Sequence, residues 1–281
     1  MYKLPVLVGA DPELFMQNPN SGEFISASDY DCLAKIPGTK HEPFKVPFGA
    51  VQIDGTALEF NIDPAKTVDE FVGYIRSVRK SLTEMVPGYN VVVEPVARFD
   101  PEYFKFEVPT SAQELGCNPD FNGWTLKMNP RPDPGGEPMR TAAGHIHIGW
   151  TEGADVEDKD HFLFCCRVAR QMDYYLGMFS LLWDADNTRR TLYGKAGAFR
   201  PKTYGMEYRV LSNKWLESEA LIRWVYNTVQ CAMADAFHDS WAEDFYGDIA
   251  RHIIDNNEVD WPESVFEFDL GLEELPMLKA A

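Results

Sequence analysis

The chain has 281 residues, of which 45% are hydrophobic, and it carries a formal net charge of −18. This length and apolar content suffice for a substantial core, and no apolar run approaches the roughly 20 residues that a transmembrane helix needs. The acidic balance argues against nucleic acid and anionic membranes as partners, because both repel a chain of this charge.

The N-terminus and the cysteines point to a reducing compartment. The stretch MYKLPVLVGADPE reaches acidic residues after a short apolar run, which is not the pattern of a signal peptide. The five cysteines are odd in number, include the adjacent pair Cys165 and Cys166, and show no CxxC spacing. We therefore expect a cytoplasmic protein with reduced thiols rather than disulfides or a zinc finger.

The N-terminal part of the chain has mostly strand patterns. Residues 6–16 (VLVGADPELFM) alternate between apolar and other residues, and the PNSG turn at 19–22 leads into EFIS as a hairpin. Residues 50–62 (AVQIDGTALEFNI) alternate on both sides of Asp54 and Gly55, a dipeptide typical of tight hairpin turns.

A helix follows, and then further strands. Thr67 and Glu70 have the spacing of a capping box, and apolar residues at helical spacing come after them. Residues 90–97 (NVVVEPVA) predict a strand, and the Pro/Gly-rich residues 129–138 predict a lid or surface loop. Residues 142–150 (AAGHIHIGW) alternate strictly, which predicts a strand with both histidines on one face and both isoleucines on the other.

The second half of the chain carries longer helices. Apolar residues recur at helical spacing over residues 157–183, and residues 215–238 and 241–255 also have helical patterns. Between them, residues 206–213 (MEYRVLSN) alternate as a strand. The sum predicts an α+β fold in which helices pack on one side of antiparallel strands.

Polar residues stand two apart in each of four predicted strands, on the face opposite the apolar residues. If the strands share a sheet, these side chains line one trough. Solvent-exposed strand faces are a simpler explanation of these polar pairs, but such faces usually also carry Thr, Lys, Ser and Gln. Carboxylates with imidazoles and no thiols suit Mg²⁺ or Mn²⁺ better than structural zinc. The pairs are Asp11 and Glu13, Glu59 and Asn61, His145 and His147, and Glu207 and Arg209.

A basic segment lies at residues 189–209 of this acidic chain. It holds six basic residues against the single acid Glu207, with three interspersed glycines. Arginines bind phosphoryl oxygens in bidentate fashion, so the segment predicts polyphosphate binding, although it contains no Walker motif. A solvated basic loop is the alternative.

In this order, the motifs GADPE, DGTALEFN, AGHIHIG and YGKAGAFRPKTYGMEYRVLSNKW resemble the phage and bacterial COOH-NH2 ligase type 2 family. That family of amidoligases belongs to the glutamine synthetase and glutamate-cysteine ligase superfamily. The matching blocks span roughly residues 8–215. The resemblance implies a single catalytic domain over residues 1–281, with an antiparallel sheet curved into a half-barrel trough, like the glutamine synthetase catalytic domain, and helices on its outer face.

The resemblance also implies an activity and its ligands. ATP phosphorylates a small-molecule or peptide carboxylate, and an amine displaces phosphate from the acyl phosphate to form an amide. The cofactors implied are ATP and Mg²⁺ or Mn²⁺, in the cytoplasm of a bacterium or a phage-infected host cell. The identity of both substrates and the oligomeric state stay open.

Roles carry over to individual residues by their place in these motifs. Asp54 matches a further acidic ligand or only a turn residue, and Ala143 stands where relatives more often have glycine. The implied metal ligands are Asp11, Glu13, Glu59, His145 and Glu207. The implied nucleotide-binding residues are His147, Arg200, Lys202 and Arg209, and the implied catalytic residues are Arg200, Glu207 and Arg209.

Two other functions are compatible with the same residues. In a zinc-dependent hydrolase, His145, His147 and a carboxylate hold zinc around an activated water. That function leaves the basic segment at 189–209 unexplained. A non-catalytic, ligase-like phage protein is the second alternative.

Overall fold

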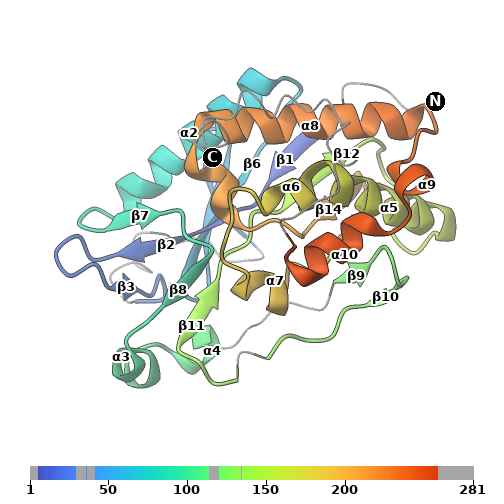
Figure 1. Cartoon of the computed structure of the whole chain (residues 1–281). Coiled ribbons are helices and arrows are strands. Elements are labelled where there is room, and N and C mark those ends of the chain that lie inside the picture. Colours follow the sequence, from blue (N-terminus) through green and yellow to red (C-terminus); the bar gives the residue numbers. More distant parts are fainter. Residues whose placement is uncertain (1–5, 30–35, 37–41, 114–119, 134, 259–281) are drawn as a thin grey trace.

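The computed structural model describes residues 6–29, 36, 42–113, 120–133 and 135–258. Its strands are short and most of its helices lie in the second half of the chain (Figure 1). The strands are β1 (Leu7–Ala10), β2 (Glu13–Gln17), β3 (Phe24–Ile25), β4 (Phe44–Val46), β5 (Gly49–Asp54), β6 (Ala57–Ile62), β7 (Asn90–Val92), β8 (Val96–Arg98), β9 (Phe121–Asn122), β10 (Lys127–Met128), β11 (Met139–Thr141), β12 (Ile146–Gly149), β13 (Ala198–Lys202) and β14 (Gly205–Tyr208). The helices are α2 (Val68–Met85), α3 (Pro101–Phe106), α4 (Thr110–Gln113), α5 (Lys159–Met172), the π-helical turn η1 (Asp173–Gly177), α6 (Met178–Ser180), α7 (Thr188–Leu192), the 3₁₀ helix η2 (Asn213–Glu217), α8 (Glu219–Phe237), α9 (Ala242–Tyr246) and α10 (Ile249–Asn256).

The fold is α+β with antiparallel strand pairing, as predicted. One sheet has the strand order β1-β12-β14-β13-β9-β10 and another has the order β3-β2-β6-β5-β4, with β7 beside β2. A ribbon of β8 and β11 completes the described strands. The second sheet curls into a half-barrel. Both predicted hairpins are present, since β2 pairs with β3 and β5 pairs with β6 across a turn in which Gly55 has a φ of 61°.

The predicted strand at 6–16 is wrong in one respect, because it is two strands. β1 pairs with β12 in the first sheet, and β2 pairs with β6 in the second. The break falls at Asp11 and Pro12, where proline has no N–H for a continuous ladder. Pro95 similarly separates β7 from β8, so residues 90–97 do not form one strand. At this break, where Asp11 lies, the chain passes from the first sheet to the second.

The predicted helices lie where the sequence places them, with differences in how three of them are divided. The Thr67 side chain accepts a hydrogen bond from the Glu70 N–H at 3.2 Å, which is one half of the predicted capping box, while the Glu70 carboxylate accepts from the Lys66 N–H at 2.7 Å. The predicted helix at 157–183 is α5 continued through η1 into α6. The helix predicted at 215–238 starts as η2 and continues as α8. The helix predicted at 241–255 is interrupted at Gly247, whose φ is 68°.

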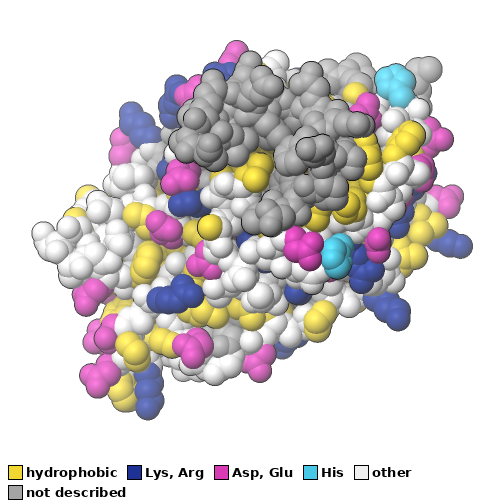
Figure 2. All heavy atoms as spheres, in the orientation of Figure 1, with side chains coloured by type: hydrophobic (Ala, Val, Ile, Leu, Met, Phe, Trp, Pro, Cys, Tyr) yellow, Lys and Arg dark blue, Asp and Glu magenta, His cyan; other side chains and the backbone are white. Residues whose placement is uncertain are grey.

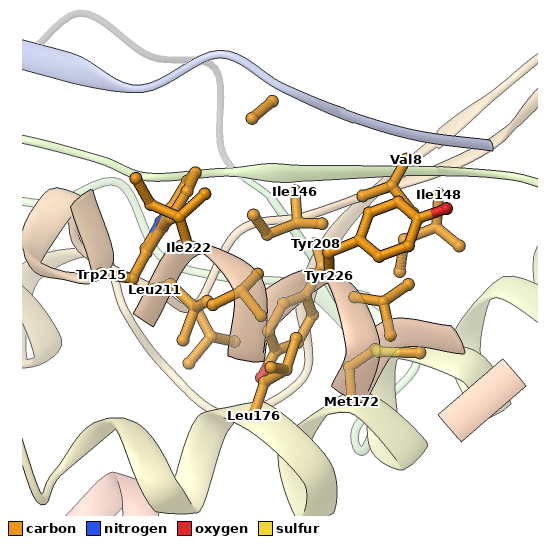
Figure 3. Packing of buried hydrophobic residues seen from close by; sticks show 14 of the residues in the cluster. Val8, Ile146, Ile148, Met172, Leu176, Tyr208, Leu211, Trp215, Ile222 and Tyr226 are labelled. Atoms are coloured by element: carbon orange, nitrogen blue, oxygen red, sulfur yellow. The ribbon is translucent and has the colours of Figure 1, made fainter. Parts of the chain in front are cut away.

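Helices cover one face of the strands and leave the other face for polar side chains. α2 packs on β5 and β6, α5 packs on β13 and β14, and α8 lies against α2 and α5 (Figure 1). Ile146 and Ile148 are fully buried on this side. Figure 3 shows both isoleucines directed toward the helices that carry Met172 and Leu176. The alternation within AAGHIHIGW therefore separates a core face from a site face.

The remaining expectations concern the surface and the thiols. Cys165 and Cys166 are buried free thiols and Cys231 is an exposed one, while Cys32 and Cys117 lie outside the described residues. Residues 129–133 and 135–138 form neither helix nor strand, as predicted for a loop. On the uncovered part of the face in Figure 2, basic side chains are scattered among acidic ones. No helix within the described part of the chain is long and apolar enough to cross a membrane.

Candidate active site

Strand register places the predicted polar residues on one face. Glu59 and Asn61 alternate with buried Leu58, Phe60 and Ile62 in β6. Across the first sheet, Glu207 lies opposite His147 on one side and opposite Arg200 on the other. In the second sheet, Glu13 lies opposite Glu59. Because side chains directly opposite each other share a face, these residues line a common trough at the junction of the sheets.

Asp11, His145 and Glu207 form a compact group in this trough. One ligand atom from each of the three lies within 4.8 Å of the others. The His145 Nδ1 is 3.2 Å from the Asp11 Oδ1 and 3.3 Å from the Glu207 Oε1. The three residues come from the β1–β2 break, the start of β12 and the middle of β14. We call this group the metal-type cluster.

Basic side chains surround the metal-type cluster. Arg209 donates from Nη1 to the His145 Nδ1 at 3.1 Å and contacts the Glu207 carboxylate. The Lys202 Nζ is 2.8 Å from the Glu207 Oε2. The positive charges of the basic segment thus face the buried carboxylates of the acidic strands.

Asp120 is a site residue that the sequence analysis missed. Its Oδ1 lies 2.6 Å from the Arg209 Nε and 3.2 Å from the Arg200 Nη2, so it bridges the two arginines. Asp120 precedes β9, which has only two residues, Phe121 and Asn122. A strand this short shows no alternation, so no pattern in the sequence indicated it.

The pKa directions describe a balanced charge array. Burial alone would raise the pKa of Asp11, but attraction to His147 and His145 holds it well below its usual range. Burial likewise opposes ionisation of Glu207, and the charge of Arg209 nevertheless lowers its pKa to about 2. Burial and Arg209 lower the pKa of His145, whereas Asp11 raises that of His147 against the effect of burial. A neutral His145 has one nitrogen lone pair, and a cation bound at Nδ1 would replace the hydrogen bond that this atom accepts from Arg209.

Glu13 and Glu59 form a second acidic pair beside the cluster. The Glu13 carboxylate accepts a hydrogen bond from the Ala143 N–H at 2.8 Å, and Glu59 accepts one from the Gln52 Nε2 at 2.5 Å. The pKa of both acids is raised, first by burial and then by neighbouring carboxylates: Asp54 for Glu13 and Asp11 for Glu59. Mutual repulsion of this kind is relieved by proton or cation binding.

Tyr204 is the second residue that the sequence did not reveal as part of the site. It lies in the turn between β13 and β14, and its hydroxyl contacts the His147 Nδ1. The two rings stack with centroids 5.9 Å apart at an angle of 29°. The His147 Nε2 is 3.0 Å from the Asp11 Oδ1, but neither of these two buried atoms has a hydrogen bond of good geometry.

Two cavities flank the metal-type cluster. A cavity of about 270 Å³ on the His147 side is largely apolar and is lined by Leu7, Gly9, Ile62 and Tyr204, among others. A narrow cavity of about 20 Å³ lies on the His145 side. Its wall includes Arg140, Arg189 and Arg209 together with Glu13 and Asp120. A further cavity of about 210 Å³ adjoins the narrow one, with which it shares Asp120 and Tyr193.

The basic segment at 189–209 is not one loop, which corrects that part of the prediction, because it contains most of α7 and all of β13 and β14. Arg189 and Arg190 lie in α7 and are buried. Arg189 donates to the backbone oxygens of Val210 and Arg209, at 2.6 and 3.0 Å. Arg190 pairs with Asp184 at 3.2 Å. Arg190 thus holds the chain in place, and Arg189 does so while also lining the narrow cavity. Arg200, Lys202 and Arg209 reach the trough.

Comparison with known families supports the resemblance seen in the motifs. Residues 134–246 match the family described as phage phiEco32-like COOH.NH2 ligase-type 2. This stretch carries His145, His147 and Arg200 to Arg209, whereas Asp11, Glu13 and Glu59 lie outside it. The match supports a carboxylate–amine ligase, and hence an enzyme. No curated protein matches the chain.

Proposed function

We propose that the protein is an ATP-dependent ligase that joins a carboxylate to an amine. The observation that carries this proposal is the metal-type cluster, placed between an apolar cavity and an arginine-lined one. In the proposed reaction a carboxylate oxygen attacks the γ-phosphorus of ATP and ADP leaves. The amine nitrogen then attacks the acyl carbon, the C–O bond to phosphate breaks, and the products are the amide, ADP and phosphate.

The residues present fit a divalent cation. Asp11, His145 and Glu207 offer two carboxylate oxygens and an imidazole nitrogen within 4.8 Å of one another. The Asp11 Oδ1 is buried without a hydrogen bond of good geometry, which leaves it suited to a cation. Glu13 and Glu59 are the candidates for a second position. A bound Mg²⁺ or Mn²⁺ would neutralise phosphoryl oxygens as charge develops on them.

The two flanking cavities suggest where the substrates bind. The apolar cavity beside His147 has room for a nucleobase, and Tyr204 offers an aromatic wall for stacking. Arg200, Lys202 and Arg209 are the cations that would hold the phosphates next to the cluster. The narrow arginine-lined cavity on the His145 side has room for little more than a carboxylate group. The rest of a small-molecule or peptide substrate would lie in the adjoining cavity of about 210 Å³. The amine, which is the other substrate, would react at the cluster between the two cavities.

The geometry favours the ligase over a zinc hydrolase. A hydrolase centre built on both histidines needs a lone pair from each imidazole directed at one ion. Here both histidines direct a nitrogen at Asp11, but only the His145 Nδ1 also lies within 3.3 Å of the Glu207 carboxylate. Only His145 belongs to the metal-type cluster.

An assay of ATP turnover tests the proposal. Purified protein with Mg·ATP is offered a panel of amino acids, peptides and amines, and ADP, phosphate and condensed products are measured by coupled assay and mass spectrometry. The proposal expects stoichiometric ADP and an amide that loses one water relative to its substrates. Nucleotide binding without turnover on any pair would favour the non-catalytic alternative, and zinc-dependent hydrolysis without nucleotide would favour the hydrolase.

A further inference from the structure

A carboxylate is buried beneath the trough, on the helix side of the sheet. Asp173 is fully buried and begins the π-helical turn η1 after α5. The Trp124 Nε1 donates a hydrogen bond to it at 2.6 Å, and the Tyr208 hydroxyl donates another at 2.7 Å. Figure 3 shows Tyr208 among the core side chains that cover this face. Burial raises the pKa of Asp173 to about 8, although both hydrogen bonds lower it.

The two donors come from the segments that hold the site's charged residues. Tyr208 ends β14 and stands between Glu207 and Arg209 in the sequence. Trp124 follows β9, and Asp120 precedes it. The backbone N–H of Trp124 donates to the Asn122 side chain at 2.9 Å, which ties the backbone at Trp124 to β9. Asp173 thus bonds to a residue in β14 and to one just after β9. The two acidic partners of Arg209, Glu207 and Asp120, lie in β14 and just before β9.

Two glycines let these side chains approach one another. A Cβ at Gly177 would lie 2.6 Å from the Tyr208 hydroxyl oxygen and 3.3 Å from the Asp173 Oδ1. A Cβ at Gly197, just before β13, would lie 2.7 Å from the Trp124 Cδ1. A side chain at either position would displace the tyrosine or the indole. This close packing links the helix layer to β9, β13 and β14.

Burying an acid costs more free energy than burying an apolar group of similar size, so a specific role for Asp173 is expected. Here the two hydrogen bonds link β14 with the segment after β9, which lie on opposite sides of β13 in the sheet. Those strand ends place Glu207 and Asp120 on either side of Arg209, which contacts Glu207 and lies 2.6 Å from Asp120. The π-helical turn displaces Asp173 from a regular α-helical course, a distortion that is frequent at functional sites.

We infer that Asp173 is a positioning residue of the ligase site: through Tyr208 and Trp124 it holds Arg209 between Glu207 and Asp120. This inference rests on the proposed function, because it takes Glu207 as a metal ligand and Arg209 as a phosphate-binding residue. Asp173 itself touches neither substrate nor cation. A solely structural role would affect the stability of the fold and leave the properties of the trough unchanged.

The test compares Tyr208→Phe and Asp173→Asn with a matched control. Tyr174→Phe also removes a buried tyrosine hydroxyl near η1, but that hydroxyl donates to the Gly247 oxygen at 2.5 Å, away from the trough. Mn²⁺ affinity is measured by electron paramagnetic resonance, and kcat and KM for ATP are measured well below the melting temperature of each variant. We expect Tyr208→Phe and Asp173→Asn to lower Mn²⁺ affinity or kcat by about 10-fold, the scale of lost supporting contacts around metal ligands. Tyr174→Phe should match the wild type in both.

The outcomes separate the inference from the proposed function. If Tyr208→Phe and Asp173→Asn lose stability but bind Mn²⁺ and turn over like Tyr174→Phe, the positioning role is wrong and the ligase proposal stands. If the wild-type protein binds neither Mn²⁺ nor ATP, the proposed function fails and the inference fails with it. If Asp173→Asn does not fold, Tyr208→Phe decides, since it keeps the carboxylate and removes only its partner.

Discussion

Replacing Glu207 by glutamine removes one charge from the centre of the trough while keeping the shape of the side chain. In the folded protein the attraction of Arg209 outweighs burial and lowers the pKa of Glu207 from 4.5 to about 2. At about 1.4 kcal/mol per pKa unit, the ionised side chain contributes about 3 kcal/mol to the free energy of unfolding at neutral pH. Arg209 keeps Asp120 as a partner in the variant, so the loss should not greatly exceed this value.

The sign of the pH dependence follows from the lowered pKa. A carboxyl with a lowered folded-state pKa stabilises the protein above its unfolded-state value of 4.5, and this contribution is lost as the pH falls toward about 2. The difference between wild type and Glu207→Gln should therefore be constant from pH 7 to pH 5 and shrink below that. Glutamine does not titrate, so this pH-dependent contribution to stability is absent from the variant.

Urea denaturation in EDTA, followed by tryptophan fluorescence, measures this difference at pH 7 and at pH 4. Glu219→Gln is the control, since Glu219 also bonds to an arginine, Arg223, but lies at the surface with 46% of its side chain exposed. Water screens such a pair, so little change is expected there. Equal stability of Glu207→Gln and wild type at pH 7, or a difference that does not shrink on acidification, would refute the charge balance described for the trough.

Three further predictions concern the trough and its support. Arg200→Gln should slow ATP use by about 100-fold or more, which is the scale for losing an electrostatic contact to a transferring phosphoryl group. The control Arg76→Gln, at an exposed pair with Glu219, should not slow it, and equal steady-state kinetics of the two variants would remove Arg200 from the site. Tyr204→Ala should weaken nucleotide binding in equilibrium dialysis more than Tyr204→Phe, because the alanine removes the cavity wall as well as the contact with His147; equal affinities would place the nucleobase elsewhere. Burial raises the pKa of Asp173 from 3.8 to about 8, so its stabilising contribution is complete below about pH 4 and is lost as the pH rises toward 8. Asp173→Asn should flatten that fall in urea denaturation at pH 5 and pH 8, and an unchanged slope would contradict it.

The strand residues of the trough follow directly from two-residue alternation. Ile146 and Ile148 require a core face, so the intervening His147 must face the opposite side, and the same holds for Glu207 between Met206 and Tyr208. Antiparallel register then brings His147 and Glu207 together. These local rules were sufficient to predict the fold class and most of the trough lining.

The parts that were not predicted depend on contacts between distant segments. The break at Pro12 assigns β1 and β2 to different sheets, and no local pattern states which partner each one takes. Asp120 and Asp173 become significant only through Arg209 and Tyr208, which lie far along the chain. The inward course of Arg189 was missed because its partners are backbone oxygens, which any residue could supply.

The central claim is that the metal-type cluster of Asp11, His145 and Glu207 holds a divalent cation with which ATP binds. Calorimetric titration of ATP into the wild-type protein, with Mg²⁺ and again with excess EDTA, tests this most directly, and Asp11→Asn serves as the comparison. We expect binding in the micromolar to millimolar range with Mg²⁺, none in EDTA, and at least about 10-fold weaker binding by Asp11→Asn. Equal ATP affinity with and without the chelator, or an Asp11→Asn protein that binds Mg·ATP like the wild type, would contradict it.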